Sequence, residues 1–303
     1  VRRLFADFRT AEKAYFERTG IFPIMHALGV RNDLAQRHPW LPASVMKAFA
    51  EAKRIADEDL REVVALIDAS RRARLDITAD CYPYDAWSST ITVLVPSRRH
   101  TDAAAVKKGL DDVGGGGNVL VSSCAAHRDY EGKTLDELAR AGNRTAVDVY
   151  IQIVKDGGAS VVCKAMKESD IRTFYQQPWV MVASDGGIGG RHPRGAGTFP
   201  RVLGRYVRES KWLSLPEAVR KMSAFPAWRL GLRDRGLLKV GMKADVVIFD
   251  ADKVLDQSTM TNPFVEPVGI TTVIVNGVPV VEQGQPTGAR PGVVLRHSAT
   301  PKR

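Results

Sequence analysis

The stretch from about residue 61 to residue 235 alternates apolar, strand-like runs with amphipathic helical patterns. The runs that read as strands cover residues 75–80, 118–123, 160–163 and 179–185. Helical patterns at 61–72 and 145–156 lie between them. Near-continuous apolar strands separated by helices are typical of a parallel sheet that is covered on both faces. A closed barrel of this kind needs eight strands and only about four such units can be counted, so the pattern predicts an α/β fold with about four parallel strands.

The pattern of predicted secondary structure changes after residue 235, from alternating strands and helices to strands alone. Residues 244–250 read as a strand, and residues 272–281 read as a hairpin around Asn276 and Gly277. These two residues suit the positive φ angles that a tight two-residue turn requires. We therefore predict a small β domain at 236–296 and a disordered tail at 297–303.

Residues 1–60 read as a third unit. An amphipathic helix is followed by an apolar segment at 20–26, and a second helix runs from about Pro42 to Asp59. In that second helix, apolar residues recur every three or four positions on one face. This face needs a partner surface, so 1–60 is expected to be a helical segment that packs on the rest.

Composition excludes several classes of protein. No apolar run approaches the roughly 18 residues that span a bilayer, and no signal-type segment follows Val1, so a cytoplasmic protein without membrane association is expected. The three cysteines are odd in number and about 40 residues apart, as in neither a disulfide framework nor a C-x-x-C metal site. The net charge of +10 comes from scattered Lys and Arg, which predicts a basic surface or a pocket for anionic substrates rather than nucleic-acid binding.

Asp185 is the sharpest local signal. It ends an apolar strand and is followed by Gly186 and Gly187. Barrel enzymes keep their catalytic groups at the C-terminal ends of strands, so Asp185 lies where chemistry is expected. An aspartate that only caps the next helix or turn would look the same.

A glycine-rich loop with three arginines follows that strand, from Arg191 to Arg201. A guanidinium can donate two parallel hydrogen bonds to a carboxylate, so an arginine here could bind an acidic substrate. A solvated loop without function is the competing interpretation.

Residues from about 61 to 296 resemble the C-terminal half of the N-acyl-D-amino-acid deacylases, or D-aminoacylases, of the amidohydrolase superfamily. The motifs that carry the resemblance are Asp80–Tyr84, Gly132–Leu135, Val182–Gly186, His192–Arg194, Gly197–Leu203, Lys243–Asp250, Val275–Gly277 and Thr287–Gly292. Several motifs in the right order over such a length are far more specific than any one of them.

The resemblance implies a partial (β/α)₈ barrel of the metal-dependent hydrolase type at 61–235, followed by a small β-sandwich domain at 236–296. It also implies zinc-dependent removal of an acyl group from a D-amino acid. Asp185 would then contact the metal and take the proton of the attacking water. Arg194 would bind the α-carboxylate of the substrate. Tyr82 stands where some members carry a histidine ligand, but a phenol is a poor substitute for imidazole on zinc, so Tyr82 is assigned no metal.

The family's other metal ligands have no counterpart here. The sequence holds no His-x-His pair, and its histidines lie outside the family's ligand motifs, at positions 26, 38, 100, 127, 192 and 297. His127 follows a strand, but one histidine cannot hold zinc without partners, so we interpret it as a loop or supporting residue. Zinc is therefore expected to be weakly bound or absent.

Residues 1–60 resemble instead the C-terminal part of the 4,5-dihydroxyphthalate decarboxylase-like proteins. The motifs are Arg2–Phe5, Tyr15–Phe16, Arg18–His26 and Arg37–Trp40. This indicates a chimera joined near residues 57–62.

Two hypotheses follow. The first is an amidohydrolase acting on the amide bond of N-acyl-D-amino acids, impaired because the metal-binding N-terminal half is missing. The second is a non-catalytic fragment or chimeric pseudoenzyme, whose exposed barrel edges could associate with another chain. A periplasmic-type binding module is a third reading, but 60 residues are too few for its two-lobed cleft.

Overall fold

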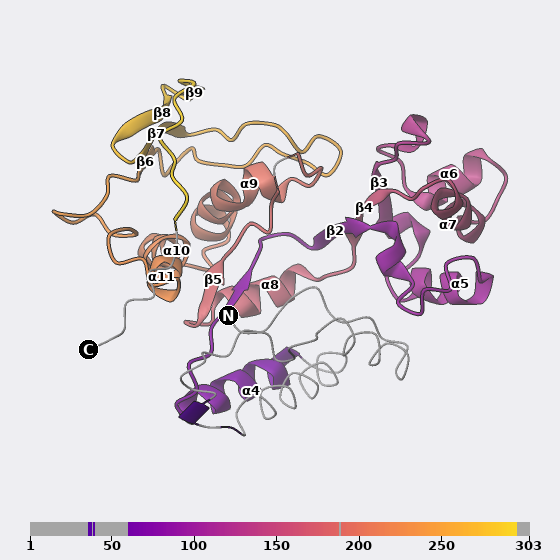
Figure 1. Ribbon diagram of the computed structural model, residues 1–303, viewed down its shortest axis with the longest axis horizontal. Helices are drawn as coiled ribbons and strands as arrows, with labels where there is room; N and C mark the ends of the chain where they lie inside the picture. The colour runs from indigo at the N-terminus through magenta and orange to yellow at the C-terminus, as the bar shows by residue number, and fades with distance from the viewer. Residues whose placement is uncertain (1–35, 38, 40–59, 188, 296–303) are drawn as a thin grey trace.

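The computed structural model describes residues 36–37, 39, 60–187 and 189–295 (Figure 1). Its α-helices are α4 (Leu60–Arg72), α5 (Ala103–Asp111), α6 (Leu135–Ala141), α7 (Ala146–Lys155), α8 (Glu168–Tyr175), α9 (Arg194–Arg201), α10 (Leu215–Met222) and α11 (Ala224–Arg229). Its strands are β1 (Ala79–Cys81), β2 (Ala86–Thr90), β3 (Val119–Ser123), β4 (Ser160–Lys164), β5 (Val180–Val182), β6 (Val246–Phe249), β7 (Ile270–Val275), β8 (Val278–Glu282) and β9 (Gln285–Pro286). The two helices and the apolar segment predicted within 1–60 lie outside the described residues.

The centre of the molecule is a parallel pair of strands, β1 and β5, with Ala79 opposite Val180 and Cys81 opposite Val182. Helices α8 and α10 and a π-helical segment (Val202–Glu209) that continues α9 surround this pair. Their side chains form one hydrophobic core, in which Tyr175, Trp179 and Tyr206 are fully or almost fully buried. Helix α4 joins it, since Asp68 accepts a 2.7 Å hydrogen bond from the Trp179 indole.

The other two predicted strands belong to a separate unit. β4 pairs with both β2 and β3 in an antiparallel sheet of order β2-β4-β3, which packs against α5, α6 and α7 around its own core (Figure 1). The expectation of about four parallel strands between 61 and 235 is therefore wrong, because the described residues contain one parallel pair and one antiparallel insert. An apolar strand reads the same in either orientation, and β2, with the sequence AWSST, is too polar to reveal itself as their neighbour.

The helices of this unit begin where the sequence provides caps. Thr134 and Glu137 form a capping box at the start of α6, and Thr145 and Asp148 form one at the start of α7. Each threonine hydroxyl accepts from a backbone N–H that the first helical turn leaves unpaired. The predicted helix at 145–156 thus matches α7 closely.

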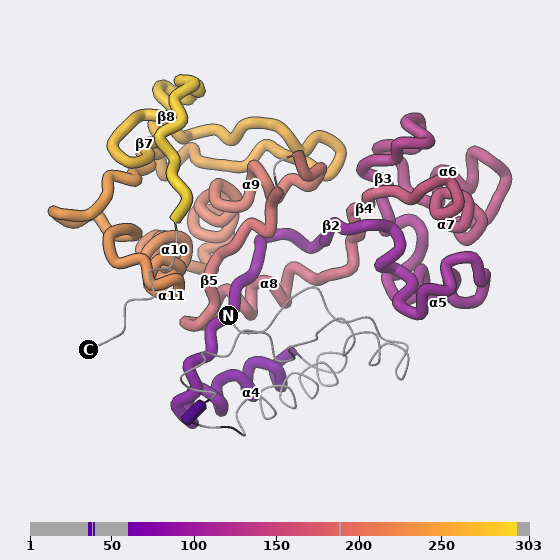
Figure 2. The backbone as a smooth tube through the Cα atoms, viewed as in Figure 1, coloured from indigo at the N-terminus to yellow at the C-terminus, as the bar shows by residue number. Residues whose placement is uncertain are grey.

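The last region contains a four-stranded antiparallel sheet of order β6-β7-β8-β9. The predicted hairpin is present: Val275 pairs with Val278, and Asn276 and Gly277 have φ angles of 48° and 82°. Between β6 and β7 the chain leaves the sheet and runs toward the β2-β4-β3 unit (Figure 2). The residues at the far end of this excursion, 260–264, face β3 across a cavity described below.

None of the helices in the described part of the chain is both long and apolar enough to cross a bilayer.

Candidate active site

Asp185 lies three residues beyond the end of β5, at the position that the strand pattern predicts. Its φ angle of 45° is in the left-handed region, which is uncommon for a residue with a side chain. The next residue, Gly186, lies so close to α9 that a Cβ atom there would come within 2.7 Å of the Gly195 Cα. The turn after β5 is therefore packed directly against the start of α9.

This packing brings Asp185 to Arg194, the first residue of α9. The Arg194 Nη2 and Asp185 Oδ2 atoms are 3.0 Å apart. The Arg194 side chain is 11% exposed and that of Asp185 is 55% exposed. The two residues that the sequence singled out for chemistry are thus adjacent, and the Asp185 carboxylate pairs with a side chain instead of capping a helix.

Tyr82, one residue after β1, completes this group. The Arg194 guanidinium carbon lies 4.9 Å from the centre of the Tyr82 ring, a cation–π distance. Burial of the phenol raises the pKa of Tyr82, although the nearby Arg194 opposes the shift. The sequence indicated only that Tyr82 is not a metal ligand. The contact of its ring with Arg194 could not be predicted, because it depends on β1 and β5 being neighbours.

His192 fixes the turn that presents Arg194. It is buried, and its Nδ1 accepts a hydrogen bond from the Arg194 backbone N–H at 3.0 Å while its Nε2 lies 3.0 Å from the Ala86 carbonyl oxygen. A backbone N–H can only donate and a carbonyl can only accept, so the ring must be neutral with its proton on Nε2. Burial, aided by Arg194, lowers the pKa of His192 to about 4, in agreement with that tautomer.

The other two arginines of the loop bind elsewhere. Arg191 pairs with Glu131 at 2.6 Å and donates to the Ser122 carbonyl. Arg201 donates to the Pro83 carbonyl at 2.7 Å and pairs with the buried Asp256 at 3.3 Å. Asp256 lies in the irregular chain between β6 and β7, where no sequence pattern pointed to it.

His127 is part of a polar contact that holds together the antiparallel unit. Its Nε2 is 2.6 Å from Asp156 Oδ2, and its ring stacks on Tyr130 with centroids 4.6 Å apart. Asp156 also accepts from Gln152. Both partners are local to the unit, which fits the interpretation of His127 as a loop or supporting residue.

A catalytic zinc needs about three protein ligands and an open position for water. Within the described ranges, no three side chains of His, Cys, Asp or Glu lie close enough together to hold a metal ion. Both ring nitrogens of His192 are engaged in hydrogen bonds, which leaves Asp185 as the single candidate ligand beside Arg194. The described residues alone therefore do not fit a catalytic zinc, and no catalytic step is derived through one.

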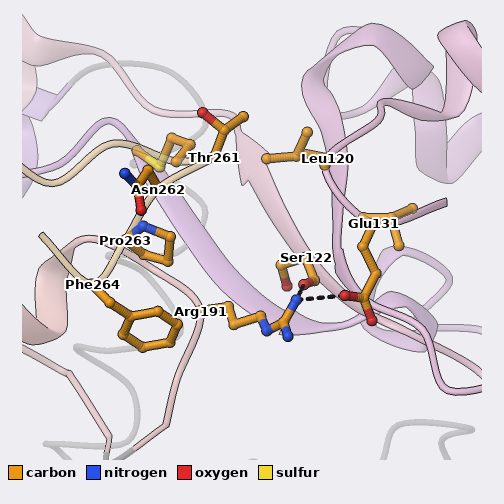
Figure 3. Close-up of a pocket in the computed structure, with 11 residues that line it drawn as sticks. Leu120, Ser122, Glu131, Arg191, Thr261, Asn262, Pro263 and Phe264 are labelled. Carbon is orange, nitrogen blue, oxygen red and sulfur yellow. Dashed lines mark hydrogen bonds and ion pairs between the residues drawn. The ribbon is translucent and has the colours of Figure 1, made fainter. Parts of the chain in front are cut away.

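A cavity of about 330 Å³ lies next to this group but does not contain it. It is bounded by the end of β3, by Glu131 and Arg191, and by residues 260–264, and Figure 3 shows the Arg191 guanidinium directed at Ser122 and Glu131. Asp185 and Arg194 are not among its walls. Arg191, at the edge of this cavity, is paired with Glu131 and also donates to the Ser122 carbonyl, so its guanidinium is held by two groups of the cavity wall.

Comparison with known proteins places one part of this chain in a known class. Residues 169–281, which include Asp185, Arg194 and Tyr206, match the model of the amidohydrolase family.

Individual relatives of this chain carry more specific names than the family model does. The chain is 39% identical over 239 residues to an N-acyl-D-glutamate deacylase and 34% identical over 241 residues to a D-aminoacylase, both from Alcaligenes xylosoxydans xylosoxydans. These matches cover 78% and 79% of this chain but 45% and 46% of the relatives, so the chain spans less than half of their length. A different protein, a 4,5-dihydroxyphthalate decarboxylase from Comamonas testosteroni, is 40% identical over 91 residues, with 28% of each chain covered.

Solved structures agree with the sequence relatives. An N-acyl-D-glutamate deacylase from Bordetella bronchiseptica, complexed with zinc and a phosphonate inhibitor, superposes with a TM-score of 0.66 at 33% identity, over 78% of this chain and 46% of its own. A D-aminoacylase structure gives 0.65 at 33% identity, over 76% and 44%. These likenesses confirm the amidohydrolase-type α/β fold expected from the resemblance.

Proposed function

We propose that this chain carries the substrate-carboxylate site of an amidohydrolase that cleaves the amide bond of N-acyl-D-amino acids. The observation that supports this most is the position of Arg194. Its guanidinium is largely buried against Tyr82, and it meets a carboxylate, that of Asp185, on its open side. A site that already holds one carboxylate is suited to bind another.

In this proposal, the Arg194 fork binds the α-carboxylate of the substrate, and the Tyr82 ring supports the guanidinium plane. His192 acts through the backbone, because its Nδ1 holds the Arg194 N–H and so orients the first turn of α9. The Asp185 carboxylate would accept a proton from the attacking water. In the relatives zinc would activate this water, but the described residues supply only one candidate ligand for it.

The proposal therefore includes impaired catalysis: on its own, the chain is expected to hydrolyse N-acyl-D-amino acids slowly or not at all and to bind zinc weakly. The competing candidate is a non-catalytic fragment or chimeric pseudoenzyme. The lack of a three-ligand group in the described part of the chain favours it. The similarity of 91 residues to an unrelated decarboxylase also favours a chimera.

The test combines metal analysis with an enantiomer-resolved assay. The purified chain is dialysed against micromolar zinc and its metal content measured. Hydrolysis of N-acetyl-D-glutamate, N-acetyl-D-methionine and their L-enantiomers is then followed, with and without a co-expressed segment covering the part of a relative that this chain does not match. Asp185→Asn tests the proton acceptor, Arg194→Gln tests carboxylate binding, and Glu131→Gln, which removes an equal charge from another arginine pair, is the control.

D-specific turnover that needs the co-expressed segment and is lost in Asp185→Asn and Arg194→Gln, but not in Glu131→Gln, would support the proposal. Stoichiometric zinc and turnover by the chain alone would show that it is not impaired. Absence of turnover in every combination would favour the pseudoenzyme.

A further inference from the structure

Arg194 and Asp185, to which the proposed function assigns substrate binding and proton transfer, contact each other. Their ion pair joins Arg194 Nη2 to Asp185 Oδ2 at 3.0 Å, so it engages one of the guanidinium nitrogens that a substrate carboxylate would use. The same contact ties up an oxygen of Asp185, the group that would accept a proton. Each side chain therefore competes with the proposed partner of the other for as long as the pair persists.

The backbone builds this contact. The left-handed φ of Asp185 turns its side chain out of the line of β5, and the close approach of Gly186 to Gly195 sets the turn against the first residue of α9. Tyr82 covers another side of the guanidinium. The direction left for a ligand is the one from which Asp185, 55% exposed, reaches Arg194.

Two other arginine–carboxylate pairs in the chain differ from this one. Glu131, paired with Arg191, is 16% exposed, and Asp256, paired with Arg201, is 1% exposed. Both arginines also donate to a backbone carbonyl, which would hold them in place if the carboxylate left. Within the described residues, the Arg194 guanidinium contacts the side chains of Asp185 and Tyr82, so its one anionic partner is an exposed side chain that can swing away.

We propose that Asp185 is an internal competitor for the substrate α-carboxylate. In the free chain it occupies Arg194. A substrate carboxylate displaces it, and this exchange releases Asp185 to act as the proton acceptor. The inference rests on the proposed function and adds to it a coupling between substrate binding and the availability of Asp185.

The size of the effect follows from the exposure of the pair. Half-exposed ion pairs are weak, so removing the competing carboxylate should strengthen substrate binding by about two- to tenfold. The exchange replaces one carboxylate by another on the same guanidinium, so it is nearly balanced, and binding still occurs in the unmodified chain.

The experiment titrates the full chain with N-acetyl-D-alanine and, separately, with N-acetyl-D-alaninamide, which lacks the carboxylate. Calorimetry gives both affinities, and acetate release is followed to confirm that the ligand remains intact. The variants are Asp185→Asn, Arg194→Gln and the control Glu131→Gln, with Asp185→Ala as a second variant at the exposed position. Circular dichroism confirms that each variant is folded.

We expect Asp185→Asn and Asp185→Ala to bind the acid about two- to tenfold more tightly, with unchanged affinity for the amide. Arg194→Gln should lose the preference for the acid, and Glu131→Gln should change neither affinity. If Asp185→Asn binds the acid no more tightly while Arg194→Gln still abolishes the preference, the competition is refuted and the carboxylate site stands. An equal gain in Glu131→Gln would mean a general effect of net charge and would also refute it. If no form prefers the acid to the amide, both the competition and the proposed function are wrong.

Discussion

Acidification should destabilise this chain through His192, and the structure gives the size of the effect. In the folded protein, burial and Arg194 lower the pKa of His192 from 6.5 to about 4, while Asp185 and Asp85 oppose the shift. Protonation would place a second proton on Nδ1, which now accepts from the Arg194 N–H. Two N–H groups would then face each other, which adds to the cost of placing a charged ring in a buried site.

The direction of the pH effect on stability follows from the linkage between proton binding and folding. Because the folded-state pKa is below the unfolded value, the stabilisation is complete above pH 6.5 and is lost as the pH falls through about 4. At about 1.36 kcal/mol per pKa unit, the difference between the two pKa values corresponds to a loss of about 3 kcal/mol of stability when the transition is complete. Many carboxylates titrate in the same range, so the effect must be isolated by a variant.

His192→Gln is that variant, since its amide can still donate to the Ala86 carbonyl but does not titrate. Urea unfolding, followed by tryptophan fluorescence at several pH values between 7 and 4, should show a steeper loss of stability in the unmodified chain than in the variant. Nuclear magnetic resonance of the His192 ring protons should give the pKa directly. A His192 pKa near 6.5, or parallel pH profiles for the two proteins, would refute the assigned tautomer and its cost.

Three further substitutions test the packing around the site. Lys221 is buried with its ammonium 2.8 Å from the Val180 carbonyl oxygen, and burial lowers its pKa. Burying the charged ammonium therefore destabilises the fold fully below the folded-state pKa, and this destabilisation disappears as the pH rises toward 10.5. Lys221→Met should remove this gain in stability at alkaline pH, measured as melting temperature against pH. Asp256→Ala leaves Arg201 without its buried anion and should cost about 2–4 kcal/mol in urea unfolding; a change below 0.5 kcal/mol would contradict the burial of that pair. Asp68→Ala removes the acceptor of the Trp179 indole and should cost about 1 kcal/mol, with faster proteolysis of α4 as a second measurement, and equal proteolysis rates would argue against that anchor.

The sequence predicted individual elements well because their signals are local. The apolar runs at 118–123 and 160–163 are strands β3 and β4, and the helix at 145–156 is α7, started by its own capping box. The Asn276-Gly277 turn needs only two residues that tolerate positive φ, and the structure has it. Asp185 could be located for the same reason, since the end of an apolar strand is visible in the sequence.

Strand pairing was decided by tertiary structure alone. An apolar strand of four or five residues has the same composition in a parallel or antiparallel sheet, so the pattern could not tell that β3 and β4 belong with the polar β2 rather than with β1 and β5. The meeting of Tyr82, Asp185 and Arg194 likewise depends on β1 and β5 being neighbours, although about 100 residues separate them in the chain. The residue types of the site are thus encoded locally, whereas the ion pair that joins Asp185 to Arg194, and the proton position on His192, exist only once the loop after β5 is packed against α9.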